Sequence, residues 1–125
     1  SAHERLADAD ALPEHIRHQE SRIRDAYRFA LANPESLKTI PCYCGCVNLG
    51  HRNNLECYLK PESTAGNPIF DDHAVPCGIC VEITHDVMEM LDVTDNPAAI
   101  RALIDSRYSD RGPGTDTPHA VEHGS

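Results

Sequence analysis

The sequence predicts an all-α fold: a small helical domain of three to four helices with a Cys-rich loop packed at its centre. Apolar residues recur at helical spacing in segments 13–33 and 77–93. Asn96-Pro97 is typical of a helix start, with a capping side chain before a proline in the first turn. No segment alternates apolar and polar residues convincingly, as a half-buried strand would.

The length of 125 residues suits one domain with a modest core. We expect a flexible leader over 1–12, a single helical Cys-rich metal-binding domain over 13–110, and a disordered tail over 111–125. The tail is polar and rich in Pro and Gly, so it has little apolar surface to bury.

The first helix is predicted to begin at Pro13, with Glu14 favourably placed in its first turn. It should end at Asn33, because the residue before a proline is disfavoured in helical geometry. Segment 34–50 contains one further proline after Pro34 and two glycines, and it is predicted to be mostly loop. The apolar face of the helix comprises Ile16, Ile23, Ala26, Tyr27, Ala30 and Leu31.

Segment 51–59 is predicted to form a short helix with Leu55 and Tyr58 on one side. Segment 60–76 is rich in turn-forming residues and should be a long connecting loop. In the helix over 77–93 one broad apolar face is predicted, and a last helix after Asn96 follows it. These two faces comprise Ile79, Cys80, Ile83, Val87, Met90 and Leu91, then Ile100, Leu103, Ile104 and Tyr108.

Three of the six cysteines, Cys42, Cys44 and Cys46, are spaced two residues apart. Their sulfurs can converge on one point if the loop curls, and Gly45 makes curling easy. The same spacing disfavours disulfides among these three, because a bridge requires a particular Cα separation and dihedral angle. The cluster therefore indicates a thiolate metal site, although each sulfur can still pair with a distant cysteine.

Cys77 and Cys80 form a CxxC motif at the start of a predicted helix. A helix N-terminus lowers a thiol pKa and so favours the thiolate form. Sulfurs three residues apart lie on one side of a turn, which suits chelation. The motif also suits thiol–disulfide exchange, but the βαβ context of thioredoxin-like proteins is not predicted here.

Cys57, His51 and His73 can complete the ligand shell. Soft thiolates select Cu(I), Zn(II) or iron–sulfur clusters, and the clusters generally use wider cysteine spacing. Four ligands suffice for structural zinc, whereas Cu(I) accepts two or three thiolates and bridged sites. We therefore expect Cu(I) first, with zinc as the alternative. The candidate ligands are Cys42, Cys44, Cys46, Cys57, Cys77, Cys80, His51 and His73.

The charge pattern narrows the classes of function. A net charge of −9 argues against binding to nucleic acid and against docking on anionic lipid through a basic patch. No hydrolytic or nucleotide-binding motif is found, so an enzyme is not predicted apart from a redox role for the CxxC. Copper sequestration or delivery is the first expectation. The alternatives are a structural zinc protein that binds a partner, and a thiol–disulfide oxidoreductase.

Segment 41–46, Pro-Cys-Tyr-Cys-Gly-Cys, resembles the signature of the bacterial PCYCGC-motif lipoproteins. The likeness continues at 50–51, 55–58, 77–81 and 100–108, and it covers roughly residues 20–110. The resemblance implies an extracytoplasmic protein whose only membrane attachment is a lipidated N-terminal cysteine, absent from this chain. A metal ion and a copper-transfer protein are the partners that would fit such a protein. An extracytoplasmic location also makes long-range disulfides the rival to thiolate ligation.

Overall fold

The computed structural model describes residues 6–43, 51–64, 66–111, 114–115 and 117. Across these residues five α-helices and three short 3₁₀ helices occur, and strand-like pairing is limited to two isolated bridges. The predicted all-α class is confirmed. The helices are α1 (Glu14–Arg17), α2 (Ser21–Ala32), α3 (Pro34–Lys38), α4 (Gly78–Leu91) and α5 (Pro97–Tyr108), with η2 (Ala9–Ala11), η4 (Asn54–Cys57) and η5 (Ser109–Arg111).

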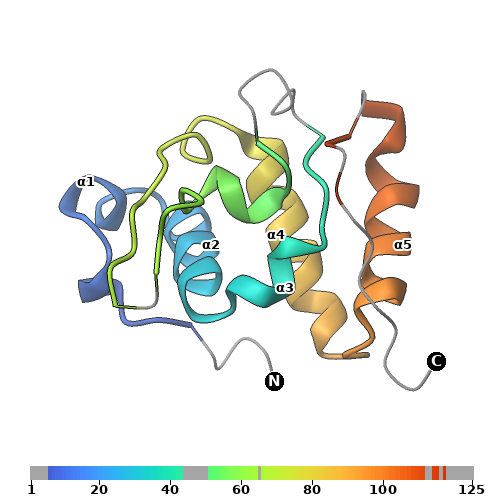
Figure 1. The fold of residues 1–125 in the computed structure, drawn as a ribbon, viewed down its shortest axis with the longest axis horizontal. Coiled ribbons are helices and arrows are strands. Elements are labelled where there is room, and N and C mark those ends of the chain that lie inside the picture. Colours follow the sequence, from blue (N-terminus) through green and yellow to red (C-terminus); the bar gives the residue numbers. More distant parts are fainter. Residues whose placement is uncertain (1–5, 44–50, 65, 112–113, 116, 118–125) are drawn as a thin grey trace.

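Helix α4 is the central element, contacting α2, α3, η4 and α5 (Figure 1). Its predicted inner face is buried at Cys80, Ile83 and Val87, each 0% exposed. The buried surface also includes Val81, Thr84 and Met88, because neighbours pack on more than one side of the helix. The Cys-rich part of the core is therefore built around α4.

The helix predicted over 13–33 is wrong as a single element, because α1 ends at Arg17 and α2 begins at Ser21. Gln19 and Glu20 occupy the positions where an unbroken apolar stripe would need a hydrophobic residue after Ile16. The Gln19 side chain donates to the backbone carbonyl of His15 at 3.2 Å, so it satisfies an acceptor at the end of α1.

Asn33 ends α2 as predicted, but the residues after it are not all loop. Pro34 begins the five-residue helix α3 in the first turn, where its missing N–H costs nothing. Leu37 is fully buried and anchors this turn. A single helical turn is too short to give a periodic signal, which is why the sequence pattern does not reveal it. The short helix expected over 51–59 is present as the 3₁₀ helix η4.

Helix α5 begins at Pro97, as predicted. The Asn96 side chain accepts hydrogen bonds from the backbone N–H groups of Ala98 and Ala99 at 3.0 and 3.4 Å. These bonds satisfy two of the donors that a helix start leaves unpaired. Ile104 on the inner face is fully buried against the rest of the core.

Some described residues of the expected leader and tail pack against the helices. Leu12 is 3% exposed, and the Ala7 N–H donates to the carbonyl of Arg28 at 3.1 Å. Thr115 and Thr117 in the expected tail are buried. Burial of single apolar or hydroxyl side chains is invisible to a composition-based prediction, and residues 1–5 and 118–125 lie outside the described part.

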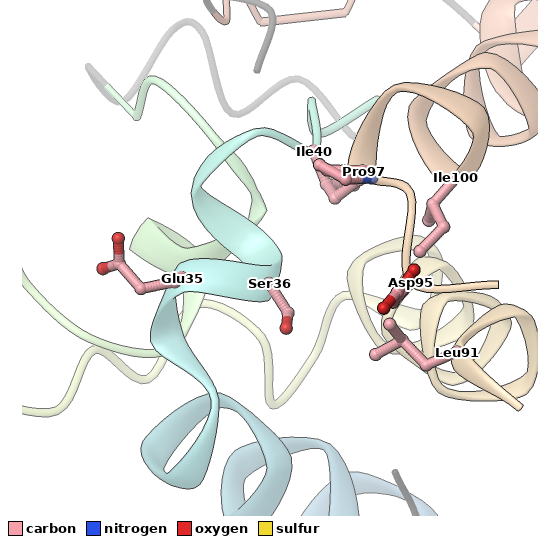
Figure 2. Close-up of a pocket in the computed structure, with 7 residues that line it drawn as sticks. All are labelled: Glu35, Ser36, Ile40, Leu91, Asp95, Pro97 and Ile100. Carbon is pink, nitrogen blue, oxygen red and sulfur yellow. The ribbon is translucent and has the colours of Figure 1, made fainter. Parts of the chain in front are cut away.

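A pocket of about 200 Å³ lies between α3 and the α4–α5 connection (Figure 2). Its lining is mostly apolar, with polar groups at Glu35, Ser36 and Asp95, and it includes none of the candidate ligands. This pocket is therefore separate from the cysteine cluster. None of the helices within the described ranges has the length and apolar character needed to cross a bilayer.

Candidate metal centre

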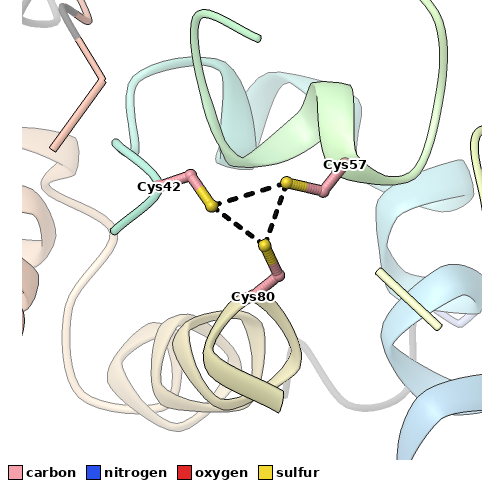
Figure 3. A group of neighbouring side chains, drawn as sticks. All are labelled: Cys42, Cys57 and Cys80. Atoms are coloured by element: carbon pink, nitrogen blue, oxygen red, sulfur yellow. Dashed lines mark hydrogen bonds between the residues drawn. The ribbon is translucent and has the colours of Figure 1, made fainter. Parts of the chain in front are cut away.

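Three cysteine side chains meet in the core (Figure 3). Cys42 comes from the loop after α3, Cys57 from η4 and Cys80 from α4, and all three are 0% exposed. The Sγ–Sγ distances are 3.5 Å from Cys42 to Cys57, 2.9 Å from Cys42 to Cys80, and 3.0 Å from Cys57 to Cys80. We call these three residues the thiol triad.

No disulfide joins the sulfurs of the triad, and they lie somewhat closer together than the sulfurs around a bound ion. A disulfide bond is about 2.05 Å long, so none of the three distances is a bond between these sulfurs. In a tetrahedral thiolate site with bonds of about 2.3 Å, neighbouring sulfurs lie about 3.8 Å apart. The three sulfurs would have to separate by less than about 1 Å to accept an ion at these bond lengths.

Two hydrogen bonds to Thr115 hold Cys42, one to its hydroxyl and one from its backbone N–H. The Cys42 N–H donates to Thr115 Oγ1 at 3.0 Å, and the Cys42 carbonyl accepts from the Thr115 N–H at 3.0 Å. Two residues earlier, the carbonyl of Ile40 accepts from the Asn54 N–H at 2.7 Å. The loop is thereby joined both to η4 and to the segment that follows α5.

A buried polar network fixes η4 against α4. Tyr58 Oη lies 3.0 Å from the carbonyl of Cys80 and 2.5 Å from Thr84 Oγ1, and Thr84 Oγ1 lies 2.8 Å from Asn54 Oδ1. Burial, reinforced by the nearby cysteines, raises the pKa of Tyr58 well above its ordinary value. The phenol is therefore a neutral donor, and the network holds the Cys57 and Cys80 backbones in fixed register.

Two further donor groups adjoin the triad. The ligand atoms of His51, Cys57 and His73 lie within 4.8 Å of one another, as do those of His73, Cys77 and Cys80. His51 Nδ1 lies 3.8 Å from Cys57 Sγ, and the two imidazole rings are 5.2 Å apart in an edge-on arrangement. Cys77 lies directly before the first residue of α4, as the CxxC motif predicts.

Asp71 contacts the ring of His51 and the backbone of His73, although the sequence pattern indicates only a turn there. Its Oδ2 lies 3.3 Å from His51 Nε2, and its Oδ1 accepts the His73 backbone N–H at 2.8 Å. The Tyr27 hydroxyl donates to the Asp71 carbonyl at 2.5 Å and so anchors the turn to α2. A carboxylate behind a histidine is a common feature of metal sites, but only the fold places this one.

Six of the eight predicted ligands thus form one connected group of donors, in which Cys57, Cys80 and His73 each belong to two sets. Cys44 and Cys46 lie outside the described residues. The group includes buried Cys and partly buried His side chains that could hold a metal ion, and its geometry does not identify the metal.

The comparisons with known proteins place the chain in one family. Residues 1–120 match the family described as "Protein of unknown function with PCYCGC motif". No curated protein and no solved structure matches the chain. Because the match spans nearly all of the 125 residues, this protein belongs to the PCYCGC-motif family.

Proposed function

We propose that this protein binds a soft metal ion, Cu(I) in preference to Zn(II), and sequesters or delivers it. The observation that carries the proposal is the thiol triad: three fully buried sulfurs, from three separate elements, lie within 3.5 Å of one another. Convergence of thiols from distant parts of a chain is what a thiolate metal site requires.

Copper is favoured over zinc by the coordination number. Three thiolates are enough for Cu(I), whereas a closed zinc site needs four ligands. A fully buried set also shields a bound Cu(I) from solvent. The net charge of −9 favours a cation, although it does not distinguish the two metals. Cys44 and Cys46, which follow Cys42 along the chain, are proposed as further donors.

A place outside the cytoplasm and a copper-transfer protein as partner complete the proposal. Both rest on the resemblance of segment 41–46 to exported lipoproteins. The full-length form would reach the membrane only through an N-terminal lipid anchor. Fractionation of cells that express the full-length protein tests this, because a soluble cytoplasmic protein would contradict it.

Anaerobic titration of the reduced chain with Cu(I), and separately with Zn(II), against a chromophoric competitor tests the metal. We expect tight Cu(I) binding that weakens by more than about 100-fold in Cys42→Ser, Cys57→Ser and Cys80→Ser. Loss of a direct ligand should cost more affinity than loss of a residue that only hydrogen-bonds to a ligand, which costs about 10- to 100-fold. His85→Gln is the matched control, because His85 bonds to the carbonyl of Arg22 and belongs to none of the three donor sets. Circular dichroism checks that each variant remains helical.

The other outcomes separate the alternatives. Binding of one zinc with no uptake of Cu(I) would replace copper by structural zinc. A purified protein that binds neither ion would refute the metal function. In that case, mixed disulfides trapped by Cys80→Ser would favour the oxidoreductase, in which the more exposed Cys77 attacks and Cys80 resolves.

A further inference from the structure

The two imidazoles beside the thiol triad extend the donor group towards the surface. The His51 side chain is 11% exposed and that of Asp71 is 22% exposed, whereas the triad is fully buried. His51, Cys57 and His73 bring two nitrogens and one sulfur within 4.8 Å of one another. We propose that these three residues bind a second metal ion, with the Cys57 thiolate bridging it to an ion in the triad.

The orientation of His51 supports this assignment. A carboxylate oxygen can only accept, so Asp71 Oδ2, which lies 3.3 Å from His51 Nε2, favours the tautomer with the ring hydrogen on Nε2. The lone pair of the neutral imidazole is then on Nδ1, the atom that lies 3.8 Å from Cys57 Sγ. His51 therefore presents its ligand atom to the sulfur that the triad also uses.

The negative charge of the thiolates favours binding of a second ion. One Cu(I) held by three thiolates leaves a charge of −2 in a fully buried site, and an uncompensated buried charge is costly. Two neutral imidazoles add a second Cu(I) without adding negative charge, which brings the group to −1. Thiolate sulfur accommodates bridging between soft ions, and imidazole suits copper and zinc equally.

His73 could instead serve the third donor set, in which it lies beside Cys77 and Cys80. The observations favour His51 and Cys57, because the contact from Asp71 orients the His51 ring towards Cys57. In addition, the Asp71 carboxylate accepts the backbone N–H of His73 and so fixes both histidines relative to one another. The two assignments differ in whether His51 or Cys77 is needed for the second ion.

The inference rests on the proposed metal function. It is tested by ¹¹³Cd NMR of the reduced 125-residue chain, with Cd(II) as the probe. We expect the triad resonance and a second one at higher field, shifted by nitrogen donors. The second should be lost in His51→Gln and in His73→Gln, and kept in Cys77→Ser. His85→Gln is the matched control, because His85 bonds to the carbonyl of Arg22 away from the cluster.

Three results would overturn the inference or its basis, and they are distinguishable. If His51→Gln leaves every cadmium signal unchanged, the second site is refuted while the metal function stands. If Cys77→Ser removes the second signal and His51→Gln does not, the second ion belongs to the other set. If no cadmium binds at all, the proposed function itself fails. The number of cadmium signals is also counted in the double variant Cys44→Ser/Cys46→Ser, in which only the cysteines that the structure describes remain. Two signals are expected there.

Discussion

At the scale of single residues, Asp71 carries a specific prediction for Asp71→Asn. In the amide, the one remaining oxygen can accept the His73 backbone N–H, which leaves the NH₂ group facing His51 Nε2. That arrangement favours the ring hydrogen on Nδ1, where it blocks the ligand atom. We expect the second ion to bind about 10-fold more weakly, the usual cost of losing a supporting carboxylate.

The measurement for Asp71→Asn combines metal affinity with the ¹⁵N shifts of the His51 ring, which report the tautomer directly. Asp72→Asn is the matched control, because the neighbouring Asp72 contacts the exposed His15 at 2.8 Å instead. An unchanged tautomer together with unchanged affinity would show that Asp71 only shapes the turn. Binding in the triad should be unaffected in either variant.

Residue chemistry explains how far the sequence could predict the site. Cysteines and histidines are recognisable as donors from their type and spacing, so the sequence alone makes Cys57 and His73 candidates. The role of Asp71 is not recognisable in this way, because acidic residues in a loop are normally turn formers. Tyr58 and Thr84 resemble ordinary core and surface residues, and only their contacts reveal that they fix Cys80.

At the scale of elements, the described residues that follow η5 pack on Cys42 and Tyr43, and Gly114 lies against the Tyr43 ring. A Cβ at this position would lie 2.7 Å from Cε1 of the Tyr43 ring. That ring cannot move easily, since its hydroxyl bonds to Asp105 at 2.5 Å and the ring stacks on Tyr108. We expect Gly114→Ala to destabilise the fold by about 1–3 kcal/mol through overpacking.

Denaturant unfolding of the reduced chain measures this effect, with Gly66→Ala as the control because nothing lies within 4 Å of a Cβ there. The control should change stability by less than about 1 kcal/mol. Equal stability of both variants would mean that the segment does not pack on Tyr43 in solution. Because Thr115 bonds to Cys42, weaker metal binding should accompany the loss of packing in Gly114→Ala.

Element prediction succeeds where local signals are strong. The start of α5 follows from one capping side chain and one proline, and both act within a single turn. The break between α1 and α2 is hard to predict because Ile16 and Ile23 are seven residues apart, as in an unbroken helix, and only the polar pair Gln19-Glu20 between them indicates otherwise. Tertiary packing of the short turn around Ile16 decides between the two, and a sequence pattern does not include it.

At the scale of the whole molecule, the triad links parts of the chain that are far apart in sequence. Cys42, Cys57 and Cys80 are separated from one another by 15, 23 and 38 positions. Helical periodicity predicts each helix separately, but it does not say which cysteines meet. That convergence depends on the packing of α4 against η4 and α3, which is a property of the complete core.

Metal binding should therefore stabilise the whole fold. The unfolded chain does not hold the three sulfurs together, so the ion binds the folded state in preference. At a free metal concentration 100 times the dissociation constant, the expected gain is about 2.7 kcal/mol. For a domain of this size, that corresponds to a rise in Tm of roughly 10 °C. Calorimetry of the reduced chain with and without Cu(I) measures this rise in Tm.

The rise should be abolished in Cys42→Ser and retained in Cys77→Ser. Only Cys42→Ser removes a sulfur through which the ion would connect the loop after α3 with η4 and α4. An equal rise in both variants would place the stabilising ion outside the triad.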